Sequence, residues 1–484
     1  MSQPQAGPVV LLSIPNTLST RNLLRTGVLA RLKTAASRVV IVAPFADDPA
    51  FKAEFVRDNV SAYPMPKYRA GKREDLLFRI LFNLYLAGNT SASMQLFLNR
   101  WIDNHPRLGA LRRAFTRHIL RRLTWLAPML ERLYTREPAP AAYLEMLSRE
   151  RPDAAVFSRL FFCDEIPLMR AARQLGIATV GAVASWDNLT NKGPLLPRLE
   201  RLLVWNDLLR NEATRLHSYA AEAVSVTGAP HHDMLFSQRH EFIDRASFFA
   251  KLGLDPAKRL ITYAGEDPII APDAPHYVRE IHRWVAGNEL AVPCQLLVRP
   301  HPQDDLSRYD EVRKLPGVFF DLPGRLLPGQ WMDMHRDDLK HLYETLMHSD
   351  VMINVSSTIV VDAAFFDTPS VCIGYGYTHP GTYFNHPMRF FEMDHYRYVI
   401  DAGATVVVQS PEALRAAIDR YLLDRSLESA GRQRIARLIA GFDDGRSAER
   451  TAEAIMAAAR AGARQGPGGE RRTTAETSAP ASAI

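Results

Sequence analysis

The stretch that decides the fold runs from Asp350 to Gly374 and reads DVMINVSSTIVVDAAFFDTPSVCIG. Its apolar run Val351–Val355 is typical of a buried parallel strand, Ser356-Ser357 is placed to cap a following helix, and Pro369–Ile373 begins the next strand. Hydroxyls and unpaired backbone N–H groups at a helix N-terminus favour an anion such as a phosphate. A capped core helix without any ligand is the competing interpretation of the same residues.

A second loop upstream favours the ligand-binding interpretation. The segment QLLVRPHPQDD, from Gln295 to Asp305, is an apolar strand that ends in Arg299, Pro300, His301 and Pro302. Ligands of open α/β sheets bind at the carboxyl ends of the strands, where this Arg and His are expected. Arg offers a planar fork of donors to a phosphate, and His can donate to a phosphate or contact a base. The sequence therefore predicts a nucleotide-phosphate site.

These two loops resemble the C-terminal half of glycosyltransferases with the two-domain GT-B architecture. The likeness is to bacterial surface-polysaccharide transferases, including the CDP-glycerol glycerophosphotransferase and polysialyltransferase-like groups, and it covers roughly residues 224–455. In those families an HP motif and a Ser-Ser or Ser-Thr motif bind the donor nucleotide, and His301-Pro302 and Ser356-Ser357 match them. The resemblance implies a nucleotide-sugar donor of CMP, CDP or UDP type. The donor-binding residues expected here are Arg299, His301, Ser356, Ser357, Thr358, Gly265 and Asp362, the last through ribose hydroxyls.

Composition bounds the class of protein. A chain of 484 residues with 47% hydrophobic and 23% charged residues is typical of a globular protein with two domains. The net charge of +6 fits an anionic partner such as a nucleotide donor, an acidic glycan or an anionic lipid, and no nucleic-acid signature is present. The three scattered cysteines argue against a disulfide framework and a zinc site. No membrane-spanning run and no basic leader are found, so we expect a cytoplasmic chain, with peripheral contact at the inner face of the membrane left open.

The first half of the chain also alternates strands and helices. Val9–Ile14 is predicted as a strand buried on both faces, and Val39–Ala43 as its neighbour. Residues about 74–137 break this alternation and are predicted to be a helical insertion. There, arginines 113, 117 and 121 form a ladder opposite the apolar residues Leu108, Leu111, Phe115, Ile119, Leu123, Leu126 and Leu130. Either the helix is packed with a solvated basic face, or it lies on an anionic membrane or acidic acceptor.

A polar loop, SWDNLTNKG, follows the predicted strand at Ala178–Gly181 and has the make-up of a ligand loop. It resembles an SWDNLT-like loop of polysaccharide transferases, which implies a position facing the interdomain cleft. Asp187 is a candidate general base, because a carboxylate near the acceptor hydroxyl can take its proton. Trp186, Asn188 and Lys192 are the acceptor-side candidates. The competing interpretation is an Asx-turn with Trp186 packed in the core.

The second domain opens with a strand followed by Gly265, Glu266 and Asp267. A glycine in this place lets the backbone approach a donor closely. Glu266 and Asp267 are alternative bases or sugar contacts. They loosely resemble an acidic motif of polysialyltransferases in which the glycine comes last. Acidic pairs elsewhere lack the context of a metal site, so neither a metal nor a cofactor is expected.

The prediction is an α/β protein with two Rossmann-like doubly wound domains that face a cleft. Residues 1–225 form the acceptor domain, 226–461 the donor domain, and 462–484 a disordered tail. The predicted function is transfer of a sugar or polyol phosphate from a nucleotide-activated donor to a glycan or lipid-linked acceptor, in surface polysaccharide biosynthesis. The alternatives are an enzyme like UDP-sugar 2-epimerases, and a non-catalytic nucleotide-sugar or polysaccharide-binding protein held at a membrane by the arginine ladder.

Overall fold

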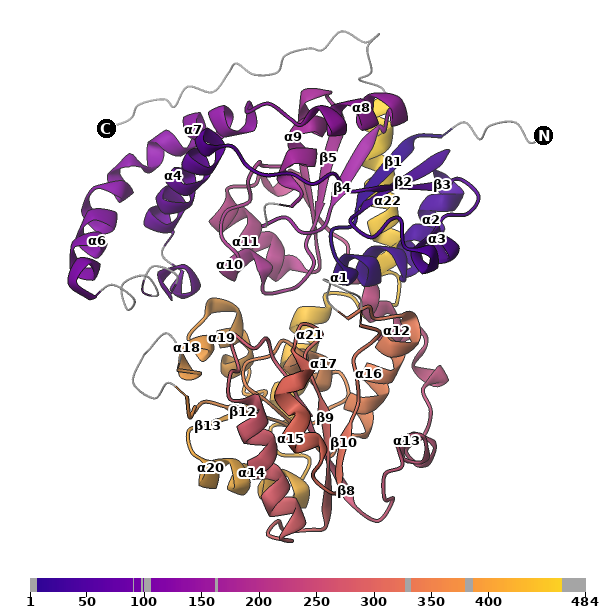
Figure 1. The fold of residues 1–484 in the computed structure, drawn as a ribbon, viewed down its shortest axis with the longest axis vertical. Helices are drawn as coiled ribbons and strands as arrows, with labels where there is room; N and C mark the ends of the chain where they lie inside the picture. The colour runs from indigo at the N-terminus through magenta and orange to yellow at the C-terminus, as the bar shows by residue number, and fades with distance from the viewer. Residues whose placement is uncertain are drawn as a thin grey trace.

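Two parallel sheets organise the computed structural model, which describes residues 7–89, 91–96, 99, 106–161, 164–326, 332–378 and 386–463. Each sheet forms the centre of one lobe (Figure 1). The first sheet contains β1 Val9–Ser13, β2 Arg38–Ala43, β3 Val60–Pro64, β4 Ala154–Phe157, β5 Ala178–Ala182, β6 Arg201–Val204 and β7 Val224–Val226. The second contains β8 Arg259–Ala264, β9 Cys294–Arg299, β10 Val318–Phe320, β11 Val351–Asn354, β12 Ser370–Ile373 and β13 Val406–Val408.

Both sheets are doubly wound, as predicted. The strand order is β3-β2-β1-β4-β5-β6-β7 in the first and β10-β9-β8-β11-β12-β13 in the second, and every pairing in both is parallel. The order reverses between β1 and β4, where Leu11 pairs with Ala155, and between β8 and β11, where Tyr263 pairs with Ile353. Loops that follow these strands lie beside the crevice in which open α/β sheets bind ligands.

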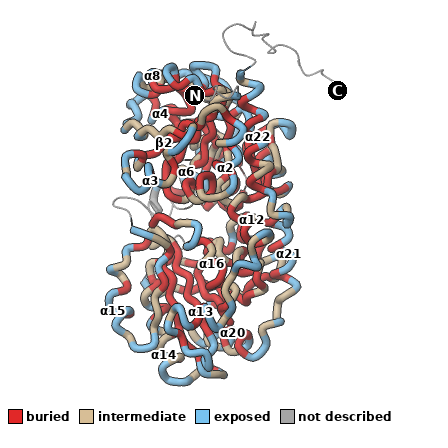
Figure 2. Tube along the Cα trace, turned by 90° about the vertical axis from the view of Figure 1, so that its right-hand side faces the viewer, coloured by how far each residue is buried: buried red, intermediate tan, exposed pale blue. Residues whose placement is uncertain are grey.

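The central strands are buried on both faces because helices cover both sides of each sheet, whereas the edge strands β3, β7, β10 and β13 are partly exposed. Figure 2 shows this as a red centre in each lobe. Around the first sheet lie α1 Thr17–Ser19, α2 Gly27–Ala35, α3 Pro49–Phe55, α4 Lys72–Gly88, α6 Pro106–His118, α7 Ala127–Thr135, α8 Ala141–Glu150, α9 Ile166–Gln174, α10 Asn188–Asn191 and α11 Asp207–His217. The rest are α12 Asp233–Ser237, α13 Arg245–Leu252, α14 Ala274–Ala286, α15 Asp310–Arg313, α16 Arg336–His348, α17 Ile359–Ala364, α18 Met388–Phe391, α19 Asp394–Asp401, α20 Pro411–Leu423, α21 Ser429–Ala440 and α22 Ser447–Ala463.

The last helix, α22, returns to the first lobe (yellow in Figure 1). It contacts α2, β4 and β5, and its Ile455 and Met456 are buried in one core cluster with Val10 and Val156. Asp233 accepts hydrogen bonds from the N–H groups of Ser447 and Ala448, both at 2.8 Å, and so caps the start of α22. We propose to count α22 with the first lobe. The boundary at 225/226 remains a prediction. Residues 464–484 of the predicted tail lie outside the described residues.

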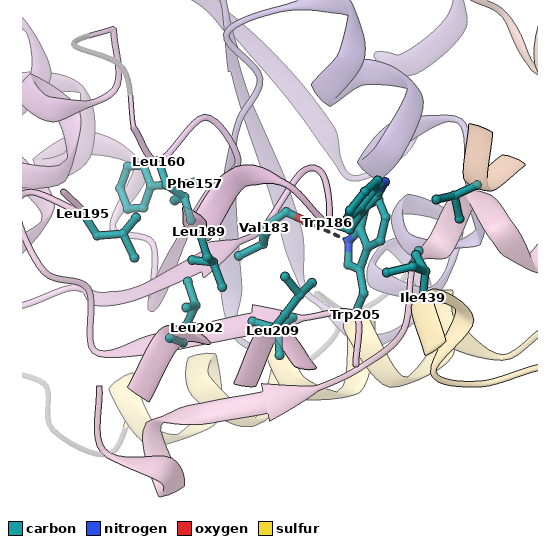
Figure 3. Close-up of a cluster of buried hydrophobic side chains, with 14 of the residues drawn as sticks. Phe157, Leu160, Val183, Trp186, Leu189, Leu195, Leu202, Trp205, Leu209 and Ile439 are labelled. Carbon is teal, nitrogen blue, oxygen red and sulfur yellow. Dashed lines mark hydrogen bonds between the residues drawn. The ribbon is translucent and has the colours of Figure 1, made fainter. Parts of the chain in front are cut away.

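The two lobes share a hydrophobic core. Trp205, at the end of β6, donates its indole N–H to the carbonyl of Val183 at 2.9 Å (Figure 3). Ile439 of α21 belongs to the same cluster, and its carbonyl accepts a hydrogen bond from the Asn206 side chain at 3.0 Å. Because side chains from both sheets fill this cluster, the lobes are held edge to edge around it.

The described part of the segment between β3 and α8 is mainly helical from Lys72 onward, while its description as an insertion remains a prediction. The expected continuous helix is broken, because a 3-10 turn at Leu120–Leu126 separates α6 from α7. The apolar stripe of α6 does not pack against the lobe. It is 46–70% exposed over Leu108, Leu111, Phe115 and Ile119. Within the described ranges no helix has the length and apolar character needed to cross a bilayer.

Replacing Ile455 by Ala should lower the free energy of unfolding by about 2 to 5 kcal/mol, because the substitution opens a cavity in the core of the first sheet. Urea denaturation measures this. Leu423→Ala is the control, since Leu423 is 70% exposed at the end of α20. Equal, small effects of the two substitutions would show that α22 does not complete the first core.

Candidate functional site

Two adjoining cavities lie between the lobes. The Asp187 cavity has a volume of about 390 Å³ and is bounded by the loops after β1, β4 and β5 of the first sheet and after β8 and β11 of the second. The Arg21 cavity has a volume of about 230 Å³ and lies beside α16 and α17. Both are lined by Ser185, His301, Ser357 and Thr358, so the two cavities form one continuous cleft.

Every residue proposed from the sequence as a site residue lines one of these cavities. The Arg21 cavity has Trp186, Gly265, Arg299 and Asp362. The Asp187 cavity has Asp187, Asn188, Lys192, Glu266, Asp267 and Ser356. Shared between them are His301, Ser357 and Thr358. Their roles remain predictions, but residues up to 176 positions apart in sequence (186 and 362) border a single cleft.

Gly265 sets how closely the loops after β8 and β9 approach each other. Its N–H donates to the carbonyl of Arg299 at 2.8 Å. A Cβ atom at this position would lie 2.8 Å from the backbone nitrogen of His301 and 3.0 Å from the Cα of Pro300, which is too close for any side chain. The glycine therefore allows the loops after β8 and β9 to pack closely against each other.

Arg299 has a partner that the sequence did not predict. Its guanidinium is ion-paired with Asp321, whose other oxygen lies 3.0 Å from His341 Nε2. Burial would raise the pKa of Asp321, but Arg299 and His341 hold it below its ordinary value. The charge of Arg299 is therefore already balanced. Its buried Nη2 has no hydrogen-bond partner among the described residues, but the ion pair with Asp321 makes Arg299 alone a poorer phosphate cation than expected.

Arg21 is the cation that the sequence analysis missed. It follows the loop after β1, its Nε donates to the Asn22 side chain at 2.9 Å, and no carboxylate within the described ranges forms an ion pair with it. Burial lowers the pKa of Arg21, while Tyr343 and Asp362 across the cavity raise it, and an arginine stays charged in such a setting. The sequence could have identified Arg21 as a candidate, because it follows the carboxyl end of the first strand, where ligands of parallel sheets bind.

The Ser356 loop supports the start of α17 through Ser357. Thr358 occupies the N-cap position without a side-chain hydrogen bond, but the Ser357 hydroxyl accepts the N–H of Ile359, the first residue of α17, at 3.5 Å, as the capping prediction required. Asn354 Oδ1 in turn accepts the N–H of Ser357 at 3.1 Å. Ser356-Ser357 thus precede the helix as a loop. Helix α17 has six residues, so its dipole is correspondingly short. Asp362 on α17 lies 3.6 Å from His232 Nε2.

His231 and His232 lie in a 3-10 turn, Pro230–His232. The turn brings the two ring centroids to within 4.3 Å of each other, and both rings pack on Trp205. Burial lowers the pKa of His231 well below its ordinary range, which keeps the ring neutral. Among the described residues no three His, Cys, Asp or Glu side chains gather to hold a metal ion.

Asp187 is a buried carboxylate held by its own loop. The side chains of Asn188 and Asn191 donate to it at 3.2 and 2.8 Å, and Lys192 Nζ lies 3.8 Å away. Burial would raise its pKa, but Lys192, His395 and the hydrogen bonds bring it below its ordinary value. Asp187 is therefore ionised at neutral pH. Trp186 is buried in the core, as the structural interpretation of this loop required.

His395, on α19 of the second lobe, was also missed. It lines the Asp187 cavity, and its ring meets Trp186 edge-on at 5.5 Å. Burial lowers its pKa to about 4, against the opposing effect of Asp187, so the ring is neutral at pH 7. No sequence signal marked it, since it lies inside an ordinary amphipathic helix far from either motif.

Glu266 and Asp267 are turned partly toward their own loop. Glu266 is buried and its Oε1 accepts the N–H of Asp267 at 3.0 Å, while Asp267 Oδ1 accepts the N–H of Ile269 at 2.8 Å. Both carboxylates line the Asp187 cavity on the side of the second lobe. They face the same space as Asp187 from the opposite wall.

Residues 195–457, more than half of the chain, match the family described as CDP-glycerol:poly(glycerophosphate) glycerophosphotransferase. The chain belongs to this glycerophosphotransferase family. It is therefore a transferase that works from a nucleotide-activated donor. A search of curated proteins found no significant match.

Solved structures show the fold of this family member. A protein from Listeria monocytogenes assigned as a UDP-N-acetylglucosamine 2-epimerase is 12% identical, with 96% of this chain and 99% of that chain covered and a TM-score of 0.52. A UDP-GlcNAc 2-epimerase from Neisseria meningitidis is 10% identical, with 93% and 100% covered and a TM-score of 0.50. The calicheamicin glycosyltransferase CalG4 is 13% identical, with 94% and 98% covered and a TM-score of 0.48. The likeness to the first of these, together with the two doubly wound sheets, gives the GT-B fold.

A buried glutamate lies where the two lobes touch beside the cleft. Glu212 on α11 accepts a hydrogen bond from the hydroxyl of Tyr398 on α19 at 3.1 Å, and its second oxygen has no partner among the described residues. Burial raises the pKa of Glu212 to about 8, and the nearby Asp394 and Asp187 also raise it. The native protein therefore holds a proton here that an unfolded chain loses near pH 4.3.

Glu212→Gln should stabilise the protein progressively as pH rises from about 5 to 8. In this window the native state binds one proton more than the unfolded state. The contribution of the protonated Glu212 side chain to the stability of the wild type is therefore full below about pH 4.3 and is lost as pH rises through about 8. The gain over wild type should approach roughly 1.4 kcal/mol per pH unit at most. Urea denaturation at several pH values measures it, with exposed Glu222→Gln as control. Parallel stability curves for Glu212→Gln and wild type would contradict the assignment.

Proposed function

We propose that this enzyme transfers a glycosyl or polyol-phosphate group from a nucleotide-activated donor to a glycan or lipid-linked acceptor. The observation that carries the proposal is the convergence of the His301 and Ser356 loops of the second sheet with the Asp187 loop of the first on one cleft. The nucleotide would occupy the Arg21 cavity, and the acceptor would enter the Asp187 cavity. The transferred group would lie where the cavities join, beside His301, Ser357 and Thr358.

The leaving phosphate needs positive charge around it in the transition state. Arg299 is balanced by Asp321, so the first-lobe Arg21 would supply the main cation, with His301 and the Ser356–Thr358 loop as further donors. Groups fixed in place before the reaction stabilise developing charge without reorganising, and one such donor is worth about 2.7 to 4 kcal/mol. Donor binding would thus draw on both lobes. Asp362 remains the proposed ribose contact.

The acceptor hydroxyl must lose a proton as the new bond forms. Asp187 is the proposed base, since its carboxylate is ionised and borders the cavity. Glu266 and Asp267 are the alternatives on the opposite wall. Trp186, Asn188 and Lys192 would support the acceptor side, the first through packing and the last two through the placement of Asp187.

The descriptions of similar proteins support a proposal for the donor class. The family description names CDP-glycerol, and a Neisseria meningitidis epimerase structure was determined with UDP-GlcNAc. We therefore propose a CDP- or UDP-activated donor. An enzyme like the epimerases would convert the donor without an acceptor, so product analysis separates the two activities.

Nucleotides should raise the melting temperature of the purified protein. At about 100 times its dissociation constant, CMP, CDP, UDP or GDP should stabilise by roughly 2.7 kcal/mol if it is the cognate nucleotide. His301→Ala and Arg21→Ala should lose this shift, whereas the exposed control variants His276→Ala and Arg279→Ala should keep it. An unchanged shift in both cleft variants would remove the donor assignment.

The exposed face of the helical segment is proposed to contact an anionic membrane. The apolar stripe of α6 is accompanied by the exposed arginines 113, 117 and 121, for which the described residues provide no ion pair. Figure 1 shows α4, α6 and α7 together at one side of the first lobe. Residues two positions apart on an α-helix are turned by about 200°, so Arg113 and Arg117 lie across α6 from Leu111 and Phe115, and Arg121 follows in the 3-10 turn. The apolar stripe would enter the interface, and the arginines would add longer-range attraction.

The double variant Leu111→Glu and Phe115→Glu should therefore reduce association with anionic liposomes more than the replacement of arginines 113, 117 and 121 by Glu does. An arginine near an anionic surface contributes about 1 kcal/mol to the free energy of membrane binding. The contribution is smaller when the arginine lies on the side of the helix that faces away from the membrane. Co-sedimentation with vesicles of phosphatidylglycerol and phosphatidylcholine measures this. Vesicles of phosphatidylcholine alone are the control. Equal sedimentation with both vesicle types would contradict the electrostatic part of the proposal.

A further inference from the structure

A third cavity opens beside the Asp187 cavity, in the first lobe alone. It has a volume of about 450 Å³ and is lined by the ends of β1, β2 and β3 together with α4 and α7. We call it the Tyr68 cavity. Asn16 and Arg159 line both it and the Asp187 cavity, so the two spaces adjoin at these residues. A chain-like ligand whose end lies at Asp187 would continue into it.

One wall of the Tyr68 cavity is aromatic. Tyr68 is 38% exposed, and Phe78 and Tyr134 lie with ring centroids 6.1 Å apart. Aromatic rings offer a large, flat apolar surface, against which the C–H face of a sugar ring packs well. The volume falls in the range of about 300 to 1,000 Å³ typical of ligand pockets. The cavity is therefore large enough for more than one sugar ring.

The charges around the cavity are nearly all balanced. Its three carboxylates are paired with arginines: Glu74 with Arg170 at 2.8 Å, Asp75 with Arg79 at 2.9 Å, and Asp164 with Arg159. Lys67 is exposed and forms no ion pair with any described residue. Among the described residues that line the cavity, Lys67 is thus the one cation that a strongly anionic chain would find without an ion-pair partner. Balanced charges that still offer hydrogen-bond donors and acceptors suit a hydroxyl-rich ligand.

We infer that the Tyr68 cavity is an acceptor subsite that holds the sugar units preceding the one that reacts at Asp187, and that its ligand is a neutral or weakly acidic glycan. This inference rests on the proposed function, because it takes the Asp187 cavity as the place of transfer. Helices α4 and α7, which form one wall, also carry the exposed Leu76 and Met129 on their outer surface. A lipid-linked acceptor held at the membrane would therefore reach the reaction cavity past Tyr68.

The test is binding of the full-length protein to a printed array of bacterial oligosaccharides and polyol-phosphate oligomers, without donor. Wild type should retain glycans of two or more sugars. Tyr68→Ala should weaken that binding on the order of tenfold. Tyr68→Phe, which keeps the ring, should bind like wild type. Tyr377→Ala, which removes a 43% exposed aromatic side chain outside all these cavities, should also leave binding unchanged.

Three outcomes would overturn the inference: no glycan retained by wild type, equal affinity of Tyr68→Ala and wild type, or retention of polyol phosphates alone. Thermal unfolding of each variant shows whether it is folded, and Tyr68→Phe separates loss of the ring from loss of the hydroxyl. The glycan array tests the subsite and the nucleotide melting assay tests the donor site, so a negative result in one leaves the other proposal standing. A nucleotide shift without glycan binding removes only the subsite, whereas glycan binding without a nucleotide shift removes only the donor assignment.

Discussion

The joining of two carboxyl sheet edges is the constraint on which the rest of the structure depends. Parallel strands send all their outgoing loops to one edge, and here the loops of both sheets meet across a shared core built on Trp205 and Ile439. The return of α22 to the first sheet adds a second connection. Because the lobes are held in this way, residues distant in sequence border the same space.

The charge of the cleft is divided between the lobes. The second lobe neutralises its own Arg299 with Asp321, whereas Arg21 of the first lobe has no ion-pair partner among the described residues. A phosphate between them would be bound weakly by either lobe alone. A further ion network crosses at the same interface, where Arg25 of the first lobe lies 2.6 Å from Asp333 of the second and also pairs with Glu54. Such buried pairs depend on geometry, so they favour one arrangement of the lobes over others.

The sequence was informative where a local rule decides the structure. Apolar runs gave the central strands, and polar residues after β9, β11 and β5 located the cleft, since position along a strand determines the sheet edge. It was uninformative where a partner decides. Asp321 beside Arg299, His395 beside Asp187 and the turn that joins His231 to His232 depend on contacts between segments that no local pattern records. The stripe of α6 shows the same limit, since its period predicted a helix but could not say what covers it.

The position of α22 determines the order in which the two lobes can be completed during synthesis. The first lobe contains the first described strand, β1, and the last described helix, α22, whereas the second sheet lies between them in sequence. On the ribosome, at about 5 to 20 residues per second, the first sheet waits roughly 10 to 50 seconds between the synthesis of β7 and that of α22. The second lobe is complete before the first. During translation, the apolar surface of β1, β4 and α2 that α22 later covers is therefore open to chaperones and to misassociation.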